Sequence, residues 1–404
     1  MAASNTTVLI SGAGVAGPSV AFWLRKYGYC PTIVESAPAL RVGGYMVDFW
    51  GVGYDVAERM GLIPTLRRSA YDIREVRLVD ERGNRLGGFS VDAFRAATGG
   101  RFFSIQRSDL ARDIFEALEG RVETIFGDSM QSLEQDESGV QVTFRHAPAR
   151  RFDLVIGADG LHSVVRALAF GAESQFEKFL GFYVAAFTSD DYPNRDEDAY
   201  VSYTTPGRQV ARYALRGGRS AFFLIWREDA NLKLDHHDVG AQKQLARDRF
   251  RGLGWECQAI LAVMDRSDDF YFDAASQIRM DRWSSNRVVL IGDAAFCPSL
   301  LAGQGSAFAM AGGHVLADAL RHAGGNHVTA FRLYEQRLRP FIEAKQRGAE
   351  HFGGWFAPKT RLGLIVRNQL TALMSVPLVG HWMVNQMFGD SLVLPDAGVE
   401  KSAA

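Results

Sequence analysis

The chain has few cysteines and no cluster of metal-ligating residues. Its three cysteines, Cys30, Cys257 and Cys297, lie far apart in 404 residues, and the sequence contains neither a CxxC pair nor a Cys/His group. The sequence therefore disfavours a disulfide framework and a zinc site. We expect no bound metal and a cytoplasmic protein, because thiols stay reduced in that compartment.

An excess of charge of one sign is also lacking. The formal net charge is −1 at neutral pH, whereas a surface for nucleic acid needs clustered basic residues. We expect no nucleic-acid partner. The first residues, MAASNTTVLIS, are too few and too weakly basic for a signal peptide, so we expect none.

No apolar run is long enough for a membrane-spanning helix. The best candidate, residues 362–388, contains a charged residue and a proline, and a spanning helix needs about 20 mostly apolar residues. Within it, Val366, Leu370, Leu373 and Met374 recur at helical spacing. This pattern predicts an amphipathic helix packed on the body of the protein, with surface contact to a membrane as the alternative.

Glycine, in contrast, is concentrated in loops that follow apolar strands. The first such loop, GAGVAG, follows a predicted strand at residues 6–11 and precedes a predicted helix, and we expect its residues Gly12, Gly14, Ala16 and Gly17 to contact a cofactor. In a dinucleotide-binding loop the first glycine permits the tight turn, the second lets the backbone approach a pyrophosphate, and the third lets the helix pack closely. A second strand follows, so this stretch is a βαβ unit that predicts a dinucleotide site.

Glu35 ends that second strand, at residues 31–35. An acid at this place accepts hydrogen bonds from a ribose diol and repels a 2′-phosphate. The alternative is a glycine-rich turn without a ligand. The motif alone fits both NAD and FAD.

Two later loops repeat the same arrangement. An apolar strand at residues 152–157 runs into Ala158-Asp159-Gly160, and another at residues 288–292 runs into Asp293. The second of these is followed by a Pro- and Gly-rich loop that ends at Gly303-Gln304-Gly305, where a helix is predicted to begin. Each loop by itself fits an ordinary turn or helix cap.

The region between these loops has a different pattern. Residues 73–92 alternate as in a hairpin that turns at 82–84, and residues 171–277 contain short alternating runs around a helical stretch at 238–264. The fold class is therefore α/β: a discontinuous Rossmann-like domain with an inserted antiparallel sheet and a C-terminal helical segment. We predict a nucleotide-binding domain (1–72, 106–172, 278–325), a substrate-binding sheet domain (73–105, 173–277) and a helical segment (326–404).

The three loops, in this order, carry a resemblance to a known family. GAGVAG, GADG and IGDAA resemble the three boxes of FAD-dependent monooxygenases of the aromatic hydroxylase type, related to p-hydroxybenzoate hydroxylase. VAGPSVAFWLRKYG, SDDFYFDAASQIRM and IGDAAFCPS are similar to the subgroup of tetracycline-inactivating flavin monooxygenases. The resemblance covers nearly the whole chain and implies FAD as the cofactor.

The resemblance also implies roles for single residues. The AMP half of FAD would occupy the first loop, Asp159 would belong to the central box, and Asp293 would accept hydrogen bonds from the ribitol. The backbone at Gly303, Gln304 and Gly305 would approach the flavin ring, with the positive end of the following helix aimed at it. Arg107 and Arg41 occupy positions where relatives place arginines near FAD, and solvated arginines are the alternative for both.

The implied reaction needs no catalytic side chain. No second G-x-G-x-x-G follows a strand, so NADPH or NADH would reduce FAD transiently and leave. Reduced flavin and O₂ would form a C4a-hydroperoxide, which hydroxylates an aromatic or polyketide-like small molecule, with a tetracycline-type antibiotic among the candidates. Alternatives are a flavin-dependent dehydrogenase or oxidase, and a non-catalytic FAD- or ligand-binding protein. Leu300, where relatives commonly have proline, keeps the last alternative open. Monomer and homodimer are both compatible with the sequence.

The substrate pocket is expected between the flavin and the inserted sheet. If Arg216-Gly217-Gly218-Arg219 is a hairpin with a two-residue loop, Arg212 lies opposite Phe223. We predict that Arg212, Phe223 and Pro298 contact the substrate, with a solvated surface arginine as the alternative for Arg212.

Overall fold

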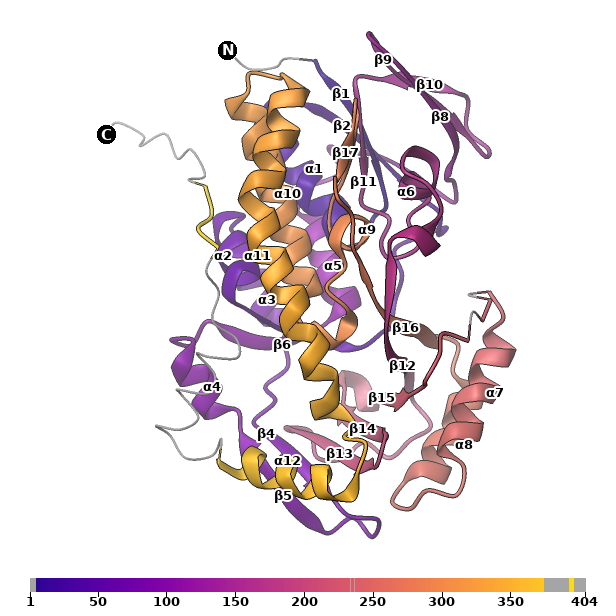
Figure 1. The fold of residues 1–404 in the computed structure, drawn as a ribbon. Coiled ribbons are helices and arrows are strands. Elements are labelled where there is room, and N and C mark those ends of the chain that lie inside the picture. Colours follow the sequence, from indigo (N-terminus) through magenta and orange to yellow (C-terminus); the bar gives the residue numbers. More distant parts are fainter. Residues whose placement is uncertain (1–4, 233, 236, 374–391, 396–404) are drawn as a thin grey trace.

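Two large sheets, joined by long helices, form the protein (Figure 1). The computed structural model describes residues 5–232, 234–235, 237–373 and 392–395. One sheet has six strands and lies at the top of Figure 1, and the other has seven strands and lies below it. The α/β class with a parallel and an antiparallel sheet is confirmed. The domain boundaries stay a prediction.

The six-stranded sheet brings the three glycine-rich loops together. β1, β11 and β18 are parallel neighbours, in register at Ser11, Gly157 and Leu290, so the loops that follow them leave the same edge of the sheet. Ligands of open α/β sheets bind at this carboxyl edge. The strands, in spatial order, are β17 (Ser284–Ser285), β18 (Val288–Leu290), β11 (Leu154–Gly157), β1 (Thr7–Ser11), β2 (Cys30–Glu35) and β7 (Glu123–Phe126), and only β17 is antiparallel.

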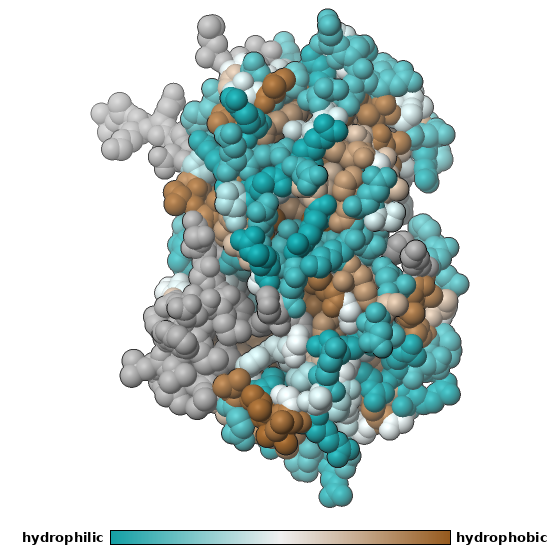
Figure 2. Space-filling model, in the orientation of Figure 1, coloured by the Kyte–Doolittle hydropathy of each residue, from teal (hydrophilic) through white to brown (hydrophobic). Residues whose placement is uncertain are grey.

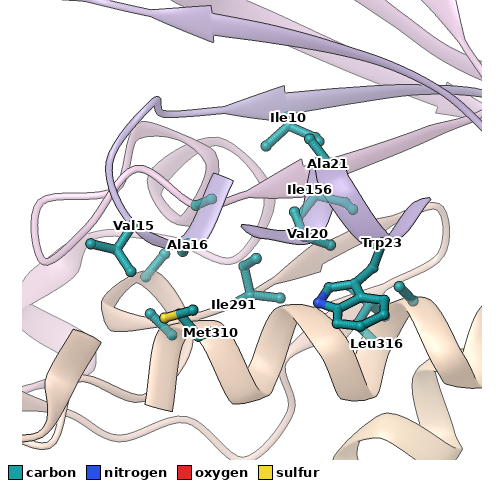
Figure 3. Packing of buried hydrophobic residues seen from close by; sticks show 14 of the residues in the cluster. Ile10, Val15, Ala16, Val20, Ala21, Trp23, Ile156, Ile291, Met310 and Leu316 are labelled. Atoms are coloured by element: carbon teal, nitrogen blue, oxygen red, sulfur yellow. The ribbon is translucent and has the colours of Figure 1, made fainter. Parts of the chain in front are cut away.

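A helix pair covers one face of this sheet and forms the main core. α1 (Ala16–Lys26) lies between the sheet and α10 (Gly305–His322), and Val20, Trp23 and Leu316 are fully buried between them (Figure 3). Gly313 of α10 lies so close to Val20 that a Cβ there would be 3.1 Å from the Val20 backbone nitrogen. This close packing fixes where the N-termini of both helices point.

The seven-stranded sheet is antiparallel except for one pair. Its strands are β16 (Tyr271–Ile278), β12 (Glu177–Ser189), β15 (Ser220–Arg227), β14 (Arg208–Ala214), β13 (Ala199–Thr205), β4 (Glu75–Val79) and β5 (Arg85–Ser90), with β13 and β4 parallel. The predicted hairpin at 73–92 is confirmed as β4 and β5.

The predicted register between β14 and β15 is wrong by one residue. Arg212 pairs with Phe222, and Ala211 pairs with Phe223. The reason is the loop: Leu215 N–H bonds to the Arg219 carbonyl, and three residues, Arg216–Gly218, form the turn instead of two. Side chains alternate between the two faces of a strand, so this single extra residue exchanges the faces of Arg212 and Phe223 relative to each other.

Smaller elements complete the fold. One small sheet consists of β8 (Met130–Asp136), β9 (Gly139–Phe144) and β10 (Arg150–Phe152). The other consists of β3 (Met46–Trp50) and β6 (Phe102–Gln106). The remaining helices are α2 (Gly51–Arg59), α3 (Ile63–Ser69), α4 (Asp92–Ala97), α5 (Arg107–Glu116), α6 (Val164–Ala169), α7 (Val239–Phe250), α8 (Cys257–Arg266), α9 (Asp293–Phe296), α11 (His327–Phe356) and α12 (Arg361–Leu373), with 3-10 turns at η1 (Glu173–Gln175), η2 (Arg216–Gly218) and η3 (Leu300–Ala302).

The C-terminal helix differs from its prediction. α12 forms and packs on β5 and β13, but Val366 and Leu370 face outward with 49% and 38% of their surface exposed, and Arg367 and Thr371 are buried instead. The predicted helical continuation over 374–388 lies outside the described residues. Among the described helices, none combines the length and apolar character needed to cross a membrane.

Candidate active site

A large cavity connects the two sheets. Its volume is about 1100 Å³, and its walls come from the loops after β1, β11 and β18 and from the inner face of β13–β16, with α12 closing one side. Pockets for drug-sized ligands usually span roughly 300–1,000 Å³. The cavity therefore has room for a dinucleotide together with part of a second molecule.

Two of the three glycines in the first loop are required by the protein itself. Gly12 has φ +104°, and a Cβ on it would lie 2.6 Å from the Ala158 carbonyl oxygen. A Cβ on Gly17 would lie 1.9 Å from the Gly12 carbonyl oxygen. A Cβ on Gly14, however, would meet no atom within 4 Å, although Gly14 lines the cavity. The space over Gly14 therefore fits a ligand that approaches the backbone.

Two helices begin at the cavity without a side-chain cap. The residues before α1 and α10, Val15 and Gln304, accept no N–H of their own helix through a side chain. Both line the cavity, as do Ala16, Gly303 and Gly305, and Gln304 also has a buried side-chain nitrogen without a partner. Unbonded N–H groups and a positive helix end favour phosphate or a flavin ring that gains negative charge.

Glu35 lies beside the first loop, as the sequence predicts. One carboxylate oxygen accepts the Ala13 N–H at 2.8 Å, and the other accepts the Ala37 N–H at 2.9 Å. Each oxygen keeps acceptor capacity toward the cavity, which Glu35 also lines. Arg41, in the loop after it, is exposed and lines the cavity as well.

The two aspartates of the later boxes differ in their bonding. Asp159 accepts hydrogen bonds from the Ser11 hydroxyl at 3.3 Å, the Ser163 hydroxyl and the Val165 N–H at 3.1 Å. It therefore holds the start of α6 in addition to lining the cavity. Asp293 is the first residue of α9, and burial raises the pKa of its carboxyl while Arg107 counteracts the rise.

Arg107 lies next to two tyrosines that the sequence interpretation missed. The Tyr45 phenol, followed by the Asp293 carboxylate, raises the pKa of the Arg107 guanidinium, although burial opposes this. Burial raises the pKa of Tyr45 to about 12. The rings of Tyr45 and Tyr271 are 5.6 Å apart, and both line the cavity. Tyr45 comes from a loop and Tyr271 from β16, so only the tertiary fold brings them together.

His162, which the sequence interpretation also missed, connects the loop after β11 to the seven-stranded sheet. Its ring lies 2.9 Å from Glu173 Oε1 and 3.5 Å from Asp273 Oδ1 on β16. Burial lowers its pKa, but the hydrogen bonds and charges of Asp273 and Glu173 outweigh this and raise the pKa to about 10. The imidazolium therefore links the central box to the seven-stranded sheet.

The structure separates the three residues predicted to contact the substrate. Phe223 lines the cavity, with its ring 6.5 Å from that of Tyr45. Arg212 points to the opposite face of the sheet, where it donates to Glu256 and Asp196, both at 2.7 Å, so its predicted place in the pocket is wrong. Pro298 is buried behind the cavity wall, and its carbonyl accepts the Gln277 amide at 3.2 Å.

Comparison with known proteins agrees with this geometry. The FAD binding domain family matches residues 5–346. The chain belongs to the FAD-binding flavin-dependent monooxygenases. A flavin-dependent monooxygenase of Legionella longbeachae is 35% identical over 360 residues, covering 87% of this chain and 88% of that protein. An uncharacterized protein of Mycobacterium tuberculosis is 40% identical over 344 residues, covering 84% and 91%.

A solved structure resembles this monooxygenase over its whole length. The crystal structure of the tetracycline destructase Tet(51) is 31% identical, has a TM-score of 0.81 and covers 97% of this chain and 99% of its own. The family identifies FAD as the cofactor of this monooxygenase. Gly14 and the uncapped ends of α1 and α10 are the features of the cavity that fit FAD.

Proposed function

We propose that this monooxygenase uses NADPH or NADH and O₂ to hydroxylate an aromatic or polyketide-like small molecule. The observation that carries the proposal is the single cavity that extends from the glycine loop at Gly14 to the aromatic wall at Phe223. A ligand bound to the sheet would there share one enclosure with the cofactor. The name of the Tet(51) destructase makes a tetracycline-type antibiotic one candidate substrate.

The first-loop residues and the ends of β2 and α9 would hold FAD. In this proposal the α1 N-terminus binds the pyrophosphate, Glu35 binds the adenosine ribose, and Asp293 binds the ribitol. The backbone at Gly303–Gly305 and the α10 N-terminus then lie at the flavin ring. Bound FAD supplies the chemistry of the reaction, namely the activation of O₂ and the transfer of one oxygen atom.

The side chains of the cavity would position the substrate and exclude water. Tyr45, Phe223 and Tyr271 present an aromatic wall, and such walls suit flat ring systems. Arg107, beside Tyr45 and Asp293, would supply a fixed positive charge to the substrate end of the cavity. No side-chain nucleophile is needed, because the protein's contribution is orientation in a site closed to water.

The test follows the oxygen atom. The FAD-loaded protein is mixed with NADPH or NADH and a panel of phenols, naphthoquinols and tetracyclines under ¹⁸O₂, and products are analysed by mass spectrometry. We expect one ¹⁸O atom per product molecule and faster NAD(P)H oxidation with the substrate. An oxidised product without ¹⁸O would instead indicate a dehydrogenase or oxidase.

The non-catalytic alternative depends on the loop at Leu300. Leu300 begins η3 and follows Ser299, whose φ of +90° and ψ of 145° are held by a hydrogen bond from the Leu301 N–H to the Ser299 hydroxyl. Residues before proline prefer such a ψ value but a negative φ, so a proline at position 300 would require the backbone at Ser299 to change. If no panel member stimulates NAD(P)H oxidation by the wild type, the Leu300→Pro variant tests whether a stiffer loop restores it.

A further inference from the structure

α12 turns its polar face inward and its apolar face outward. Leu362, Ile365 and Val366 are 70%, 58% and 49% exposed, and the brown patch over α12 at the lower left of Figure 2 shows this face. Arg367 and Thr371, one turn apart, are only 6% and 2% exposed. A surface helix normally buries its apolar stripe. The inward polar face therefore needs a reason other than core packing.

Arg367 is the residue that this orientation buries. It lines the cavity from α12, and its Nε has no hydrogen-bond partner. Burial lowers its pKa to about 10, which leaves it protonated at neutral pH, and the Tyr200 phenol partly counteracts this effect. In the part of the chain that the structure describes, no carboxylate is within ion-pair distance of its guanidinium, whereas the buried Arg212 on β14 has two.

Polar groups around Arg367 already have other hydrogen-bond partners. The Thr371 hydroxyl donates to the Arg367 carbonyl at 2.7 Å, so it does not serve the guanidinium. Tyr200 of β13 also lines the cavity and feels the charges of both Asp48 and Arg367. Asp48, in turn, accepts the Ser104 hydroxyl at 2.6 Å. These side chains make a polar end of the cavity, far in sequence from the three FAD boxes.

A buried cation without a counter-charge is costly, because desolvation is not repaid by pairing. A fork of N–H donors that faces a cavity is suited to a planar anionic group. We propose that Arg367 binds an anionic oxygen of the substrate, a phenolate, an enolate or a carboxylate, and that α12 thereby makes the site selective for anions. This inference rests on the proposed function and identifies the substrate's charge.

The experiment compares one ring system in two charge states. The probes are 2-hydroxy-1,4-naphthoquinone, which is ionised at neutral pH, and its neutral 2-methoxy ether. Binding to the full-length, FAD-loaded protein is followed through the change in the visible FAD spectrum, without NAD(P)H. Arg367→Gln removes the charge, Arg367→Lys keeps it, and Arg361→Gln is the matched control, because Arg361 is an exposed arginine on the same helix.

We expect the wild type and Arg361→Gln to bind the anion at least about tenfold more tightly than the ether, as for a hydrogen bond to a charged group. Arg367→Gln should abolish this ratio, and Arg367→Lys should keep part of it. Equal binding of both probes by the wild type, binding of neither, or an unchanged ratio in Arg367→Gln would overturn the proposal. If Arg367→Gln does not load FAD, Arg367→Lys provides the test. Its ammonium group keeps the charge but lacks the planar set of N–H donors, so the ratio of anion to ether affinity should fall severalfold.

This outcome is independent of the reaction type. Binding that depends on Arg367 without incorporation of ¹⁸O would overturn the proposed hydroxylation and leave the anion site standing. Incorporation of ¹⁸O with unchanged selectivity in Arg367→Gln would overturn the anion site alone.

Discussion

The Glu35 carboxylate accepts the backbone N–H of Ala13 at 2.8 Å, so an acid at the end of β2 holds the loop that follows β1. Ala13 lies between Gly12 and Gly14, the residues that form the turn and the open floor of the cavity. Because the Ala37 N–H holds the second oxygen, the carboxylate is oriented by the protein alone. A ribose diol would therefore meet a preorganised acceptor.

Replacing Glu35 by Gln should weaken FAD binding. A glutamine has one acceptor oxygen and one NH₂ donor, so it cannot accept from Ala13 and Ala37 and also from a ribose. We expect the FAD dissociation constant to rise about tenfold or more, because hydrogen bonds to charged groups contribute roughly 1.5–3 kcal/mol. Fluorescence titration of the apoprotein measures it. Glu134→Gln, at an exposed position on β8, is the control and should leave the affinity unchanged.

Gly14→Ala and Gly17→Ala should fail in different ways. A Cβ on Gly14 has open space within the protein, so this variant should fold normally but lose most FAD binding. A Cβ on Gly17 overlaps the Gly12 carbonyl, and such overpacking typically costs about 1–3 kcal/mol or more. Chemical denaturation of the apoproteins separates the two. Equal destabilisation of both variants would contradict a ligand-imposed glycine at position 14.

His162 should stabilise the fold in a pH-dependent way. Its pKa is raised from its ordinary value to about 10 because Asp273 and Glu173 outweigh the effect of burial. A raised pKa gives stability that is fully present below about pH 6.5, the unfolded pKa, and that is lost as the pH rises through about 10. Thermal unfolding at pH 6 should therefore show a lower Tm for His162→Gln than for the wild type, and the difference should vanish near pH 10. His146→Gln, at an exposed histidine, is the matched control variant.

The parts of the site that were predictable are those set by local sequence. At Gly12, Asp159 and Asp293 a strand, a turn and a helix start occur within a few residues. The order of these three loops carries the family resemblance that implies FAD-binding roles for Asp159 and Asp293, and the structure places the three strands side by side. Tyr271 and Arg367 could not be found in this way, because they enter the cavity from β16 and α12 through tertiary packing. The apolar periodicity of α12 even predicted the opposite orientation, since periodicity assumes that the interior is apolar.

The misplacement of Arg212 has a simple origin. Both a two-residue and a three-residue turn fit the letters RGGR, and the difference reverses the faces of the strand. Gly217 and Gly218 both have positive φ, which either turn allows. The register therefore depended on a choice that the local sequence leaves open.

Arg212→Met should consequently lower the stability of the fold without changing ligand binding, whereas Phe223→Ala should weaken ligand binding. Arg212 is 5% exposed at its side chain and pairs with Asp196 and Glu256. Removing one partner of a buried ion pair costs about 3–5 kcal/mol when the charge left behind is unpaired. In Arg212→Met, Asp196 keeps its ion pair with Arg77 and Glu256 keeps its ion pair with Arg195, so we expect a loss at or below the lower end of this range. Urea denaturation measures the free energy of unfolding.

Ligand binding distinguishes the two positions. At conditions where both variants are folded, Arg212→Met should bind 2-hydroxy-1,4-naphthoquinone as the wild type does, because its side chain faces away from the cavity. Phe223→Ala removes an aromatic wall beside Tyr45, and aromatic contacts contribute about 0.5–1.5 kcal/mol beyond their buried area. Its dissociation constant should therefore rise about tenfold. A loss of binding in Arg212→Met with unchanged stability would mean that the β14–β15 register is the predicted one after all.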